Sequence, residues 1–322
     1  MLKEDVIDIL EQHKGNVVTG GRLAGALGVS RSAVWKAVHL LRDEGHDIES
    51  IPNKGYSLST ADDTLNENTI RKNLNTSFVG QKMIVLPTVH STNQYLKELD
   101  AETTDNGFVV IADGQTNGRG RRGRAFASPK GEGIYLSVHL KLEGTRQDVR
   151  FVTICAAVAV SKAIEHTCGI DADIKWVNDI FYNGKKVCGI LTEAVLSGEL
   201  GELNVLLGIG VNTGIVPPGL GDIATSVWEA TGMRGIRNRL VAEVLNQFEA
   251  AYLDCIARDR WRDVVAHYRS KLFILGKRVL VTDMARQYEA IVQDVDDAGA
   301  LVVKDDAGNV RHVASGEILL KW

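Results

Sequence analysis

The segment that decides the fold of the N-terminal region is LAGALGVSRSAVWK, residues 23–36. Its first half carries an apolar stripe that stops at Gly28, and Ser30 stands where its side chain can cap a following helix. A helix, a glycine-containing turn and a second helix with a polar outer face have the spacing of a helix-turn-helix. We expect the second helix to run to about Leu41, with Leu40 among its inward-facing residues.

The sequence around this segment completes a small domain. An amphipathic helix precedes it, and the stretch from Ile48 to Leu58 predicts a hairpin, or wing, with a Pro-Asn-Lys-Gly turn. Residues 1–62 are therefore predicted to be a winged helix-turn-helix, which places its second helix in the DNA major groove. The expected DNA contacts are Arg22, Ser30, Arg31, Ser32, Trp35, Lys36 and Lys54. A protein–protein adaptor is the alternative, because the nearly balanced charge of this region weakens its attraction for phosphates.

The rest of the chain predicts two further domains. From Lys82 apolar runs alternate with helical stretches, which indicates one α+β domain over residues 63–274. From Lys277 the sequence becomes short strands separated by turns such as DDAG, which predicts a small β-barrel over residues 275–322. The predicted fold class is therefore α+β with several domains.

Composition excludes several classes of protein. The 322 residues are 44% hydrophobic and 24% charged, which is typical of a folded globular chain, and the net charge of −4 excludes a general affinity for nucleic acid. The four cysteines are too widely spaced for a metal site. The N-terminus lacks the pattern of a signal peptide, and the longest apolar run, residues 152–164, is too short to span a bilayer. We therefore expect a cytoplasmic protein with no membrane partner.

The most informative segment for chemistry is GQTNGRGRRGR, residues 114–124. Its glycines allow the backbone to approach a ligand closely, and its four arginines, with no acid among them, can pair with phosphate oxygens. A flexible RNA-binding loop and a solvated basic loop are the alternatives. The segment follows a predicted buried strand over 108–112, which favours a binding loop held by a rigid scaffold. We expect the loop to order around a polyphosphate or an adenylate.

A second candidate is HSTNQ, residues 90–94, at the start of a predicted helix. Its hydroxyl and amide groups could bind a neutral polar head such as a ureido ring. A purely structural role is the alternative, since Ser91 could simply cap the helix.

Two further candidates surround a predicted strand end. In DIKWVND, residues 173–179, Lys175 and Asp179 could meet a phosphate and a Mg²⁺ ion, or Asn178 and Asp179 could form an ordinary turn. In NGKKVCGIL, residues 183–191, Lys186 could neutralise a carboxylate as it becomes an acyl phosphate, or could be solvated. None of these segments decides the function by itself.

Taken together, the four segments resemble the biotin protein ligases, and they occur in the order of that family. The N-terminal region, with NKGYSL at residues 53–58, resembles the subgroup that doubles as the biotin operon repressor. The ending VASGEILLKW resembles the family's small C-terminal barrel. The resemblance implies a central biotin/lipoate-ligase-like domain and a C-terminal SH3-like β-barrel.

The resemblance also implies an activity and partners. The enzyme would make biotinyl-5′-AMP from biotin and ATP with Mg²⁺, then transfer biotin to a lysine of the biotin carboxyl carrier protein of a carboxylase. Biotinyl-AMP would also act as co-repressor, so that a homodimer binds the operator DNA of biotin genes. A lipoate-type ligase and a non-catalytic, ligand-sensing transcription factor are the alternatives.

The family's site residues map onto this sequence as follows. Biotin binding falls to Ser91, Thr92, Asn93, Gln115, Gly118, Arg119, Gly120, Arg121 and Lys186. ATP and adenylate binding falls to Arg119, Arg121, Arg122, Phe126, Lys175, Asn178, Asp179 and Asn212. Catalysis falls to Arg121, Lys175 and Lys186, and Mg²⁺ binding to Asp179. Two residues depart from the family pattern: Val177 stands where proline is frequent, and Phe126 where tryptophan is frequent.

Overall fold

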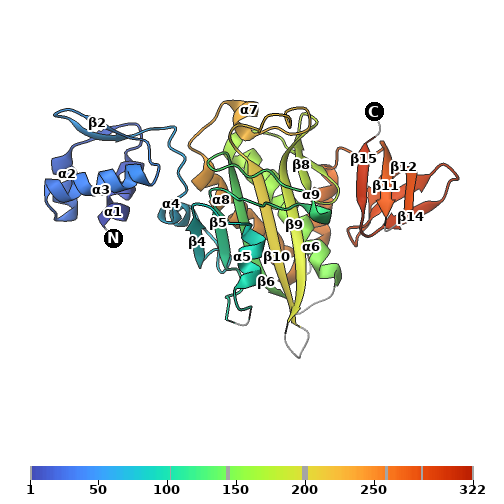
Figure 1. The fold of residues 1–322 in the computed structure, drawn as a ribbon. Helices are drawn as coiled ribbons and strands as arrows, with labels where there is room; N and C mark the ends of the chain where they lie inside the picture. Colours follow the sequence, from blue (N-terminus) through green and yellow to red (C-terminus); the bar gives the residue numbers. More distant parts are fainter. Residues whose placement is uncertain are drawn as a thin grey trace.

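The structure, a computed structural model, describes residues 2–101, 103–142, 146–197, 202–257, 260–283 and 286–320. Three parts follow one another along the molecule: a small N-terminal domain, a large sheet covered by helices, and a small C-terminal sheet (Figure 1). The last two residues of the C-terminal motif, Lys321 and Trp322, lie outside the described residues.

The N-terminal domain is the predicted winged helix-turn-helix. Its elements are α1 (Leu2–Gln12), β1 (Val17–Val18), α2 (Gly20–Leu27), α3 (Arg31–Asp43), β2 (Ile48–Ile51) and β3 (Gly55–Leu58), with the strands in the order β1-β3-β2. The chain leaves α2 through Gly28 at φ +66°, and the Ser30 hydroxyl accepts a hydrogen bond of 3.2 Å from the Ala33 N–H. Both features were predicted from the sequence, because left-handed backbone favours glycine and an exposed helix start favours serine.

One prediction for α3 is wrong. Leu40 was expected to face inward, yet it is 53% exposed, and Val38 is buried instead. A helix of 3.6 residues per turn places Val34, Val38 and Leu41 on one face and turns Leu40 away from it. The seven residues predicted to contact DNA are all exposed.

The central domain is built on a seven-stranded sheet. Its strands, in spatial order, are β4 (Met83–Leu86), β5 (Val109–Ala112), β6 (Gly133–Leu142), β10 (Glu202–Asn212), β9 (Lys185–Ser197), β8 (Asp179–Tyr182) and β7 (Asp173–Lys175). The β4–β5 pair is parallel, and the other pairs are antiparallel. This mixed, mainly antiparallel sheet confirms the α+β prediction.

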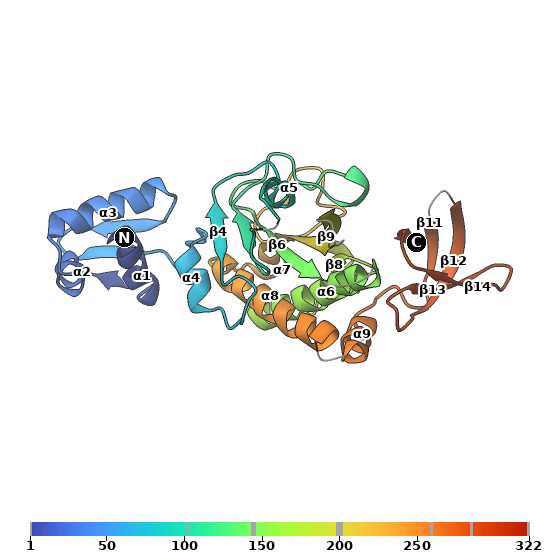
Figure 2. The same cartoon turned by 90° about the horizontal axis from the view of Figure 1, so that it is seen from below.

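Helices cover both faces of this sheet (Figures 1 and 2). The long helices α6 (Arg146–Cys168) and α8 (Arg237–Tyr252) pack together behind it with α9 (Trp261–Ser270), and α5 (Thr92–Glu98) lies on the opposite face. Shorter helices are α4 (Glu67–Lys72), α7 (Val227–Thr231) and the turn η2 (Leu253–Ala257). By length and composition Val149–Cys168 could cross a membrane, but 83% of this stretch is buried within the protein, as in a core helix.

The C-terminal part consists of short strands, as predicted, and the structure describes five of them. They are β11 (Arg278–Asp283), β12 (Arg286–Val295), β13 (Leu301–Asp305), β14 (Val310–Val313) and β15 (Glu317–Leu320), in the order β14-β13-β12-β11-β15. Within the described residues no pairing closes β14 onto β15, so the structure gives a five-stranded antiparallel sheet. Its apolar side chains join the core of the central domain, and the Trp176 indole N–H donates to the Gly299 carbonyl at 3.2 Å.

Asp62, at the end of the N-terminal domain, is a buried acid whose hydrogen bonds lead to a first prediction. The Asp62 carboxylate lies 3.1 Å from His46 Nδ1 and accepts the Asp47 N–H at 2.8 Å. Burial alone would raise the pKa of Asp62, but these hydrogen bonds outweigh burial and lower it. A lowered pKa contributes stability above the ordinary pKa of aspartate, about 3.9, and that stability is lost as the pH falls through the folded value.

Asp62→Asn is therefore expected to destabilise the N-terminal domain near pH 7 by about 1.5–3 kcal/mol, the range for hydrogen bonds to a charged group. The destabilisation should shrink as the pH falls below about 4, where Asp62 of the unfolded chain takes up a proton, and should vanish once the pH falls below the lowered pKa of the folded state. Urea unfolding followed by the ¹⁹F signal of fluorinated Trp35, the one tryptophan of residues 1–62, measures this. The exposed Asp43→Asn is the control, and an equal loss at both pH values would contradict the assignment.

Candidate active site

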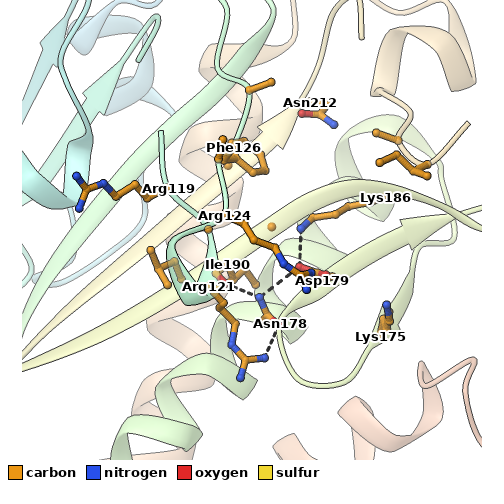
Figure 3. A pocket seen from close by; sticks show the side chains of 18 of the residues that line it. Arg119, Arg121, Arg124, Phe126, Lys175, Asn178, Asp179, Lys186, Ile190 and Asn212 are labelled. Atoms are coloured by element: carbon orange, nitrogen blue, oxygen red, sulfur yellow. Dashed lines mark hydrogen bonds and ion pairs between the residues drawn. The ribbon is translucent and has the colours of Figure 1, made fainter. Parts of the chain in front are cut away.

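The four sequence segments meet around one cavity of about 640 Å³. It lies against strands β8, β9 and β10 (Figure 3). Residues of β15, in the C-terminal sheet, form part of its wall. The predicted residues that line it are Ser91, Thr92, Asn93, Gln115, Arg119, Gly120, Arg121, Phe126, Lys175, Asn178, Asp179, Lys186 and Asn212. Of the described residues predicted for the site, Gly118 and Arg122 lie outside this lining.

One end of the cavity is polar and uncharged. The Thr92 N–H donates to Gln115 Oε1 at 2.9 Å, and Gln115 Nε2 donates to Ser128 Oγ at 2.8 Å. The Ser137 hydroxyl lies 2.7 Å from Thr92 Oγ1 and 2.6 Å from Asn93 Oδ1. These bonds fix the amide and hydroxyl groups in place before any ligand arrives, which reduces the cost of ordering them on binding.

Ser91 does not act as the helix cap that was the alternative to a binding role. In the part of the chain that the structure describes, its hydroxyl does not cap α5, although the residue is buried and lines the cavity. The alternative of a simple helix cap is therefore wrong for this side chain. Ser128 and Ser137 were missed from the sequence. The available signal for Ser137 was a hydroxyl residue within an apolar strand.

Glycines on β9 and β10 form the floor of the cavity. A Cβ at Gly208 would lie 2.7 Å from Asn93 Oδ1, and one at Gly210 would lie 2.5 Å from the Phe126 ring. A Cβ at Gly189, the cross-strand neighbour of Gly210, would lie 2.9 Å from Lys186 Nζ. Any larger residue would fill the space of the ligand-facing side chains, so these positions need glycine for close approach.

The arginine-rich segment folds as a short hairpin. The Phe126 N–H donates to the Gly118 carbonyl at 2.9 Å, and the Gly120 N–H donates to the Arg124 carbonyl at 2.7 Å. The turn η1 (Arg121–Gly123) joins the two arms. A Cβ at Gly118 would lie 2.5 Å from the Phe126 carbonyl oxygen, so this glycine allows the hairpin to close.

The arginines of the hairpin point in different directions. Arg121 donates to Asn178 Oδ1 at 3.2 Å and to the Gly316 carbonyl at 2.8 Å, and burial, the largest effect, lowers its pKa. Arg124 lines the cavity and pairs with Glu317 at 2.8 Å. Arg122 turns toward Glu317 as well, at 3.5 Å, and lies outside the cavity where ATP binding had been predicted. Arg119 is exposed at the rim and points away from Lys186 (Figure 3).

Glu317 therefore ties the C-terminal sheet to the hairpin, a contact that the sequence did not predict. Glu317→Gln should leave the fold intact but increase the release rate of a bound adenylate about two- to fivefold, because partly exposed ion pairs contribute roughly 0.2–1 kcal/mol. Stopped-flow dissociation of the labelled adenylate measures the rate. Glu289→Gln on β12, which pairs with Arg278, is the control. An unchanged rate in Glu317→Gln would remove this role.

The opposite end of the cavity is cationic. Lys186 Nζ lies 2.8 Å from Asp179 Oδ1 and 5.8 Å from the centre of the Phe126 ring (Figure 3). Burial is the main cause that lowers the pKa of Lys175, and Asp179 opposes it. In all, the cavity lining carries five cationic side chains and three carboxylates: Arg119, Arg121, Arg124, Lys175 and Lys186 against Asp179, Asp222 and Glu317. Such an excess of positive charge favours an anionic ligand.

The turn that holds Asp179 is firmly fixed despite Val177. The Val177 carbonyl accepts a 3.0 Å hydrogen bond from the Tyr268 hydroxyl. Asn178 Nδ2 donates to the Ile190 carbonyl at 2.7 Å and to Asp179 Oδ1 at 3.2 Å. These hydrogen bonds hold the turn although Val177 stands where proline is frequent in the family.

An apolar wall completes the cavity. It consists of the Phe126 ring together with Val216, Pro217, Leu220 and Ile223. Asn212 Nδ2 donates to the Thr225 carbonyl at 3.0 Å at the edge of this wall. A flat heteroaromatic ring fits between such apolar and aromatic surfaces. The loop over residues 214–224 could not be assigned to the site from the sequence, because it has no charged or repeated motif.

Comparison with known proteins agrees with this arrangement. The sequence profile of the Biotin/lipoate A/B protein ligase family matches residues 85–212, that of an HTH domain matches 3–57, and that of the Biotin protein ligase C terminal domain matches 274–321. The chain is 34% identical to the bifunctional ligase/repressor BirA of Bacillus subtilis (strain 168), over 99% of this chain and 98% of that protein. The chain belongs to the biotin protein ligase family.

Further relatives of this ligase family are similar over most of the chain. The bifunctional ligase/repressor BirA of Escherichia coli (strain K12) is 29% identical over 95% of this chain and 94% of its own. The solved structure of the Aquifex aeolicus biotin protein ligase in complex with biotin and ATP has a TM-score of 0.65 and 28% identity, covering 75% of this chain and 99% of that one. Most residues that line the cavity lie within the matched ligase region, those of β15 lie within the matched C-terminal region, and the loop at 216–224 lies between the two matches.

Proposed function

We propose that the protein is a biotin protein ligase and a biotin-dependent repressor. It makes biotinyl-5′-AMP from biotin and ATP and transfers biotin to a lysine of the biotin carboxyl carrier protein of a carboxylase. The observation that carries this proposal is the cavity itself, with a neutral hydrogen-bonding end and a cationic end joined across a glycine floor. The full-length similarity to proteins named bifunctional ligase/repressor supports both halves of the function.

Biotin has a neutral ureido ring at one end and a carboxylate at the other. The ureido ring would bind the uncharged end, at Ser91, Thr92, Asn93 and Gln115. Its carboxylate would then point toward Lys186, with Gly120 and Arg121 of the hairpin above it. In this role Gly118 acts indirectly, by closing the hairpin, and Arg119 would join the site from the rim.

Adenylation follows from this placement. A biotin carboxylate oxygen attacks the α-phosphorus of ATP, an oxygen–phosphorus bond forms, and the bond to pyrophosphate breaks. Lys186, Arg121 and Lys175 stabilise the negative charge that develops, since fixed cations in a partly buried site need no reorganisation. Adenine would lie against Phe126 and the apolar wall, with Asn212 at its edge. The carrier lysine then attacks the acyl carbon and AMP leaves.

A magnesium ion fits this site only together with the nucleotide. Among the described residues no group of three or more His, Cys, Asp or Glu side chains could hold a metal ion, and Asp179 is the carboxylate that pairs with Lys186. Mg²⁺ commonly binds through one or two carboxylates plus substrate phosphates, so Asp179 would hold it with ATP. When bound, the ion supplies further neutralisation of phosphate charge.

Repression would use the N-terminal domain as a homodimer. We infer that biotinyl-AMP favours dimerisation, so that two α3 helices reach the two half-sites of an operator in biotin genes. The exposed residues Arg22, Ser30, Arg31, Ser32, Trp35, Lys36 and Lys54 support DNA contact at this surface. We also propose a cytoplasmic location, domain boundaries at residues 62/63 and 274/275, and an SH3-like form for the C-terminal sheet.

Incubation with biotin, ATP, Mg²⁺ and a biotin carrier domain tests the ligase. We expect a biotinylated carrier band on an avidin blot, and none when ATP is omitted. Labelled lipoate offered in place of biotin separates the two ligase classes, because their family profile is shared. Lipoylation of its carrier without biotinylation would contradict the proposal, and so would failure to release pyrophosphate with either acid.

A further inference from the structure

The linker between the N-terminal domain and the sheet is held from both sides. It runs from β3 to α4 (Figure 1) and contains two consecutive aspartates whose carboxylates bind different domains. Asp62 binds back to His46 and the Asp47 N–H in the N-terminal domain. Asp63 instead accepts the backbone N–H of Arg237, at the start of α8, at 2.7 Å. The linker therefore fixes the N-terminal domain to the ligase domain.

Arg237 is a buried cation that none of the proposed ligase steps uses. It is 3% exposed, and its guanidinium donates to the Asp63 carbonyl and lies 3.7 Å from the Asp63 carboxylate. The same guanidinium donates to Asp113 Oδ1 at 2.5 Å and to the Gly133 carbonyl at 3.1 Å. One side chain thus joins the linker to two points on the central sheet.

These two points are the two ends of the segment that carries the arginine hairpin. Asp113 follows β5 and directly precedes the segment 114–132, and Gly133 begins β6 directly after it. The two ends lie side by side, since the Gly131 N–H donates to the Asp113 carbonyl at 3.1 Å. Gly133 also pairs across the sheet with Asn212 at the cavity edge. A rearrangement of the hairpin on its ligand therefore acts directly on the groups that bind Arg237.

We propose that Arg237 is a positioning residue that couples closure of the arginine hairpin to the placement of the DNA-binding domain. The route runs from Asp113 and Gly133, at the ends of the hairpin segment, through the Arg237 guanidinium to Asp63 in the linker. This inference rests on the proposed function, in which the adenylate is the ligand of the hairpin.

Charge explains why the contact transmits a change. Two half-buried carboxylates, Asp63 and Asp113, share the guanidinium of Arg237, so a shift of the guanidinium toward one changes its distance to the other. Burial raises the pKa of Asp63, and Arg237 opposes that rise, so the charge of Asp63 depends on this partner. The neighbouring Asn238 reinforces the link, because its side chain donates to the Thr64 carbonyl and accepts the Asn66 N–H, both at 2.8 Å.

Amide hydrogen exchange of residues 59–66 tests the coupling, with and without biotin, ATP and Mg²⁺. Pyrophosphate release is measured on the same samples. In wild type we expect the ligands to change linker exchange about tenfold, within the usual range of coupling between sites. Asp63→Ala removes both the side-chain acceptor of the Arg237 N–H and the ion pair with its guanidinium, and it should lose this response while its rate of pyrophosphate release stays within about twofold of wild type. Asp113→Asn should lose the response and also release the adenylate about tenfold faster.

The control is Lys72→Gln, which breaks a different ion pair between the domains, with Asp8 at 2.8 Å. It should keep the full ligand response of the linker. An unchanged linker in a wild-type sample that releases pyrophosphate would overturn the coupling and leave the ligase intact. A full response in Asp63→Ala, or its loss in Lys72→Gln, would also overturn this route. A wild type that releases no pyrophosphate would overturn the proposed function together with the coupling.

Discussion

Lys186→Ala is expected to lower the rate of biotinyl-adenylate formation by on the order of 10²- to 10³-fold, the usual cost of removing one group that stabilises transition-state charge. Lys186 Nζ lies between the Asp179 carboxylate and the Phe126 ring, where the biotin carboxylate and the α-phosphate would meet. Without it, Asp179 remains as an unpaired negative charge that repels both substrates. Pyrophosphate release with saturating biotin and ATP measures the loss.

The fold should survive this change, because the Lys186 side chain is 31% exposed and its backbone bonds to residues 223 and 225 remain. Lys185→Ala removes the adjacent lysine, which is exposed and lies outside the described cavity lining, and serves as the control. Its rate should stay within about threefold of wild type. Undiminished pyrophosphate release from Lys186→Ala would show that this lysine does not act in the chemistry.

Arg121→Gly is expected to release the adenylate about 10- to 100-fold faster, since a hydrogen bond to a charged group is worth about 1.5–3 kcal/mol. Arg121 is the arginine of the hairpin that both lines the cavity and anchors the turn to Asn178 and Gly316. Its loss removes a positive charge from the phosphate end and frees the hairpin to open. Free biotinyl-AMP should therefore accumulate in solution and undergo hydrolysis.

Two variants separate charge from flexibility. Arg121→Lys keeps the charge but loses the paired donors, so its release rate should fall between those of wild type and Arg121→Gly. Lys130→Gly adds a glycine at the exposed far end of the same loop and should retain the adenylate as wild type does. Equal retention by Arg121→Gly and wild type, in a filter-binding assay of labelled adenylate, would refute this role.

Much of the site could be predicted because its chemistry is local in sequence. The hydroxyl and amide groups of residues 91–93, the arginine segment and Lys186 each stand in a short motif, and all three line the cavity. The winged helix was also predictable, because Ser30 and Gly28 mark helix ends by backbone rules that act within one turn.

What could not be predicted depends on contacts between distant residues. Arg119, Arg121 and Arg122 are chemically identical and stand within four positions of one another. Only the three-dimensional path of the hairpin turns Arg122 toward Glu317 and leaves Arg119 at the rim of the cavity. Ser137 and the loop at 214–224 belong to segments with no motif of their own. Glu317 stands in the C-terminal motif, but nothing in that motif indicates its contact with the arginine hairpin. The role of Arg237 could not be predicted either, since its partners Asp63 and Asp113 are more than 120 positions away in the sequence.

Trypsin digestion tests the central claim most directly, since the arginine hairpin offers cleavage sites at residues 119–124. The protein is digested alone and after incubation with biotin, ATP and Mg²⁺, and the bound nucleotide is extracted from the same samples. We predict that the incubated protein retains biotinyl-AMP and that cleavage within the hairpin slows at least tenfold, as expected for a segment that folds over its ligand. Equal cleavage in both samples, with no retained mixed anhydride, would contradict the account.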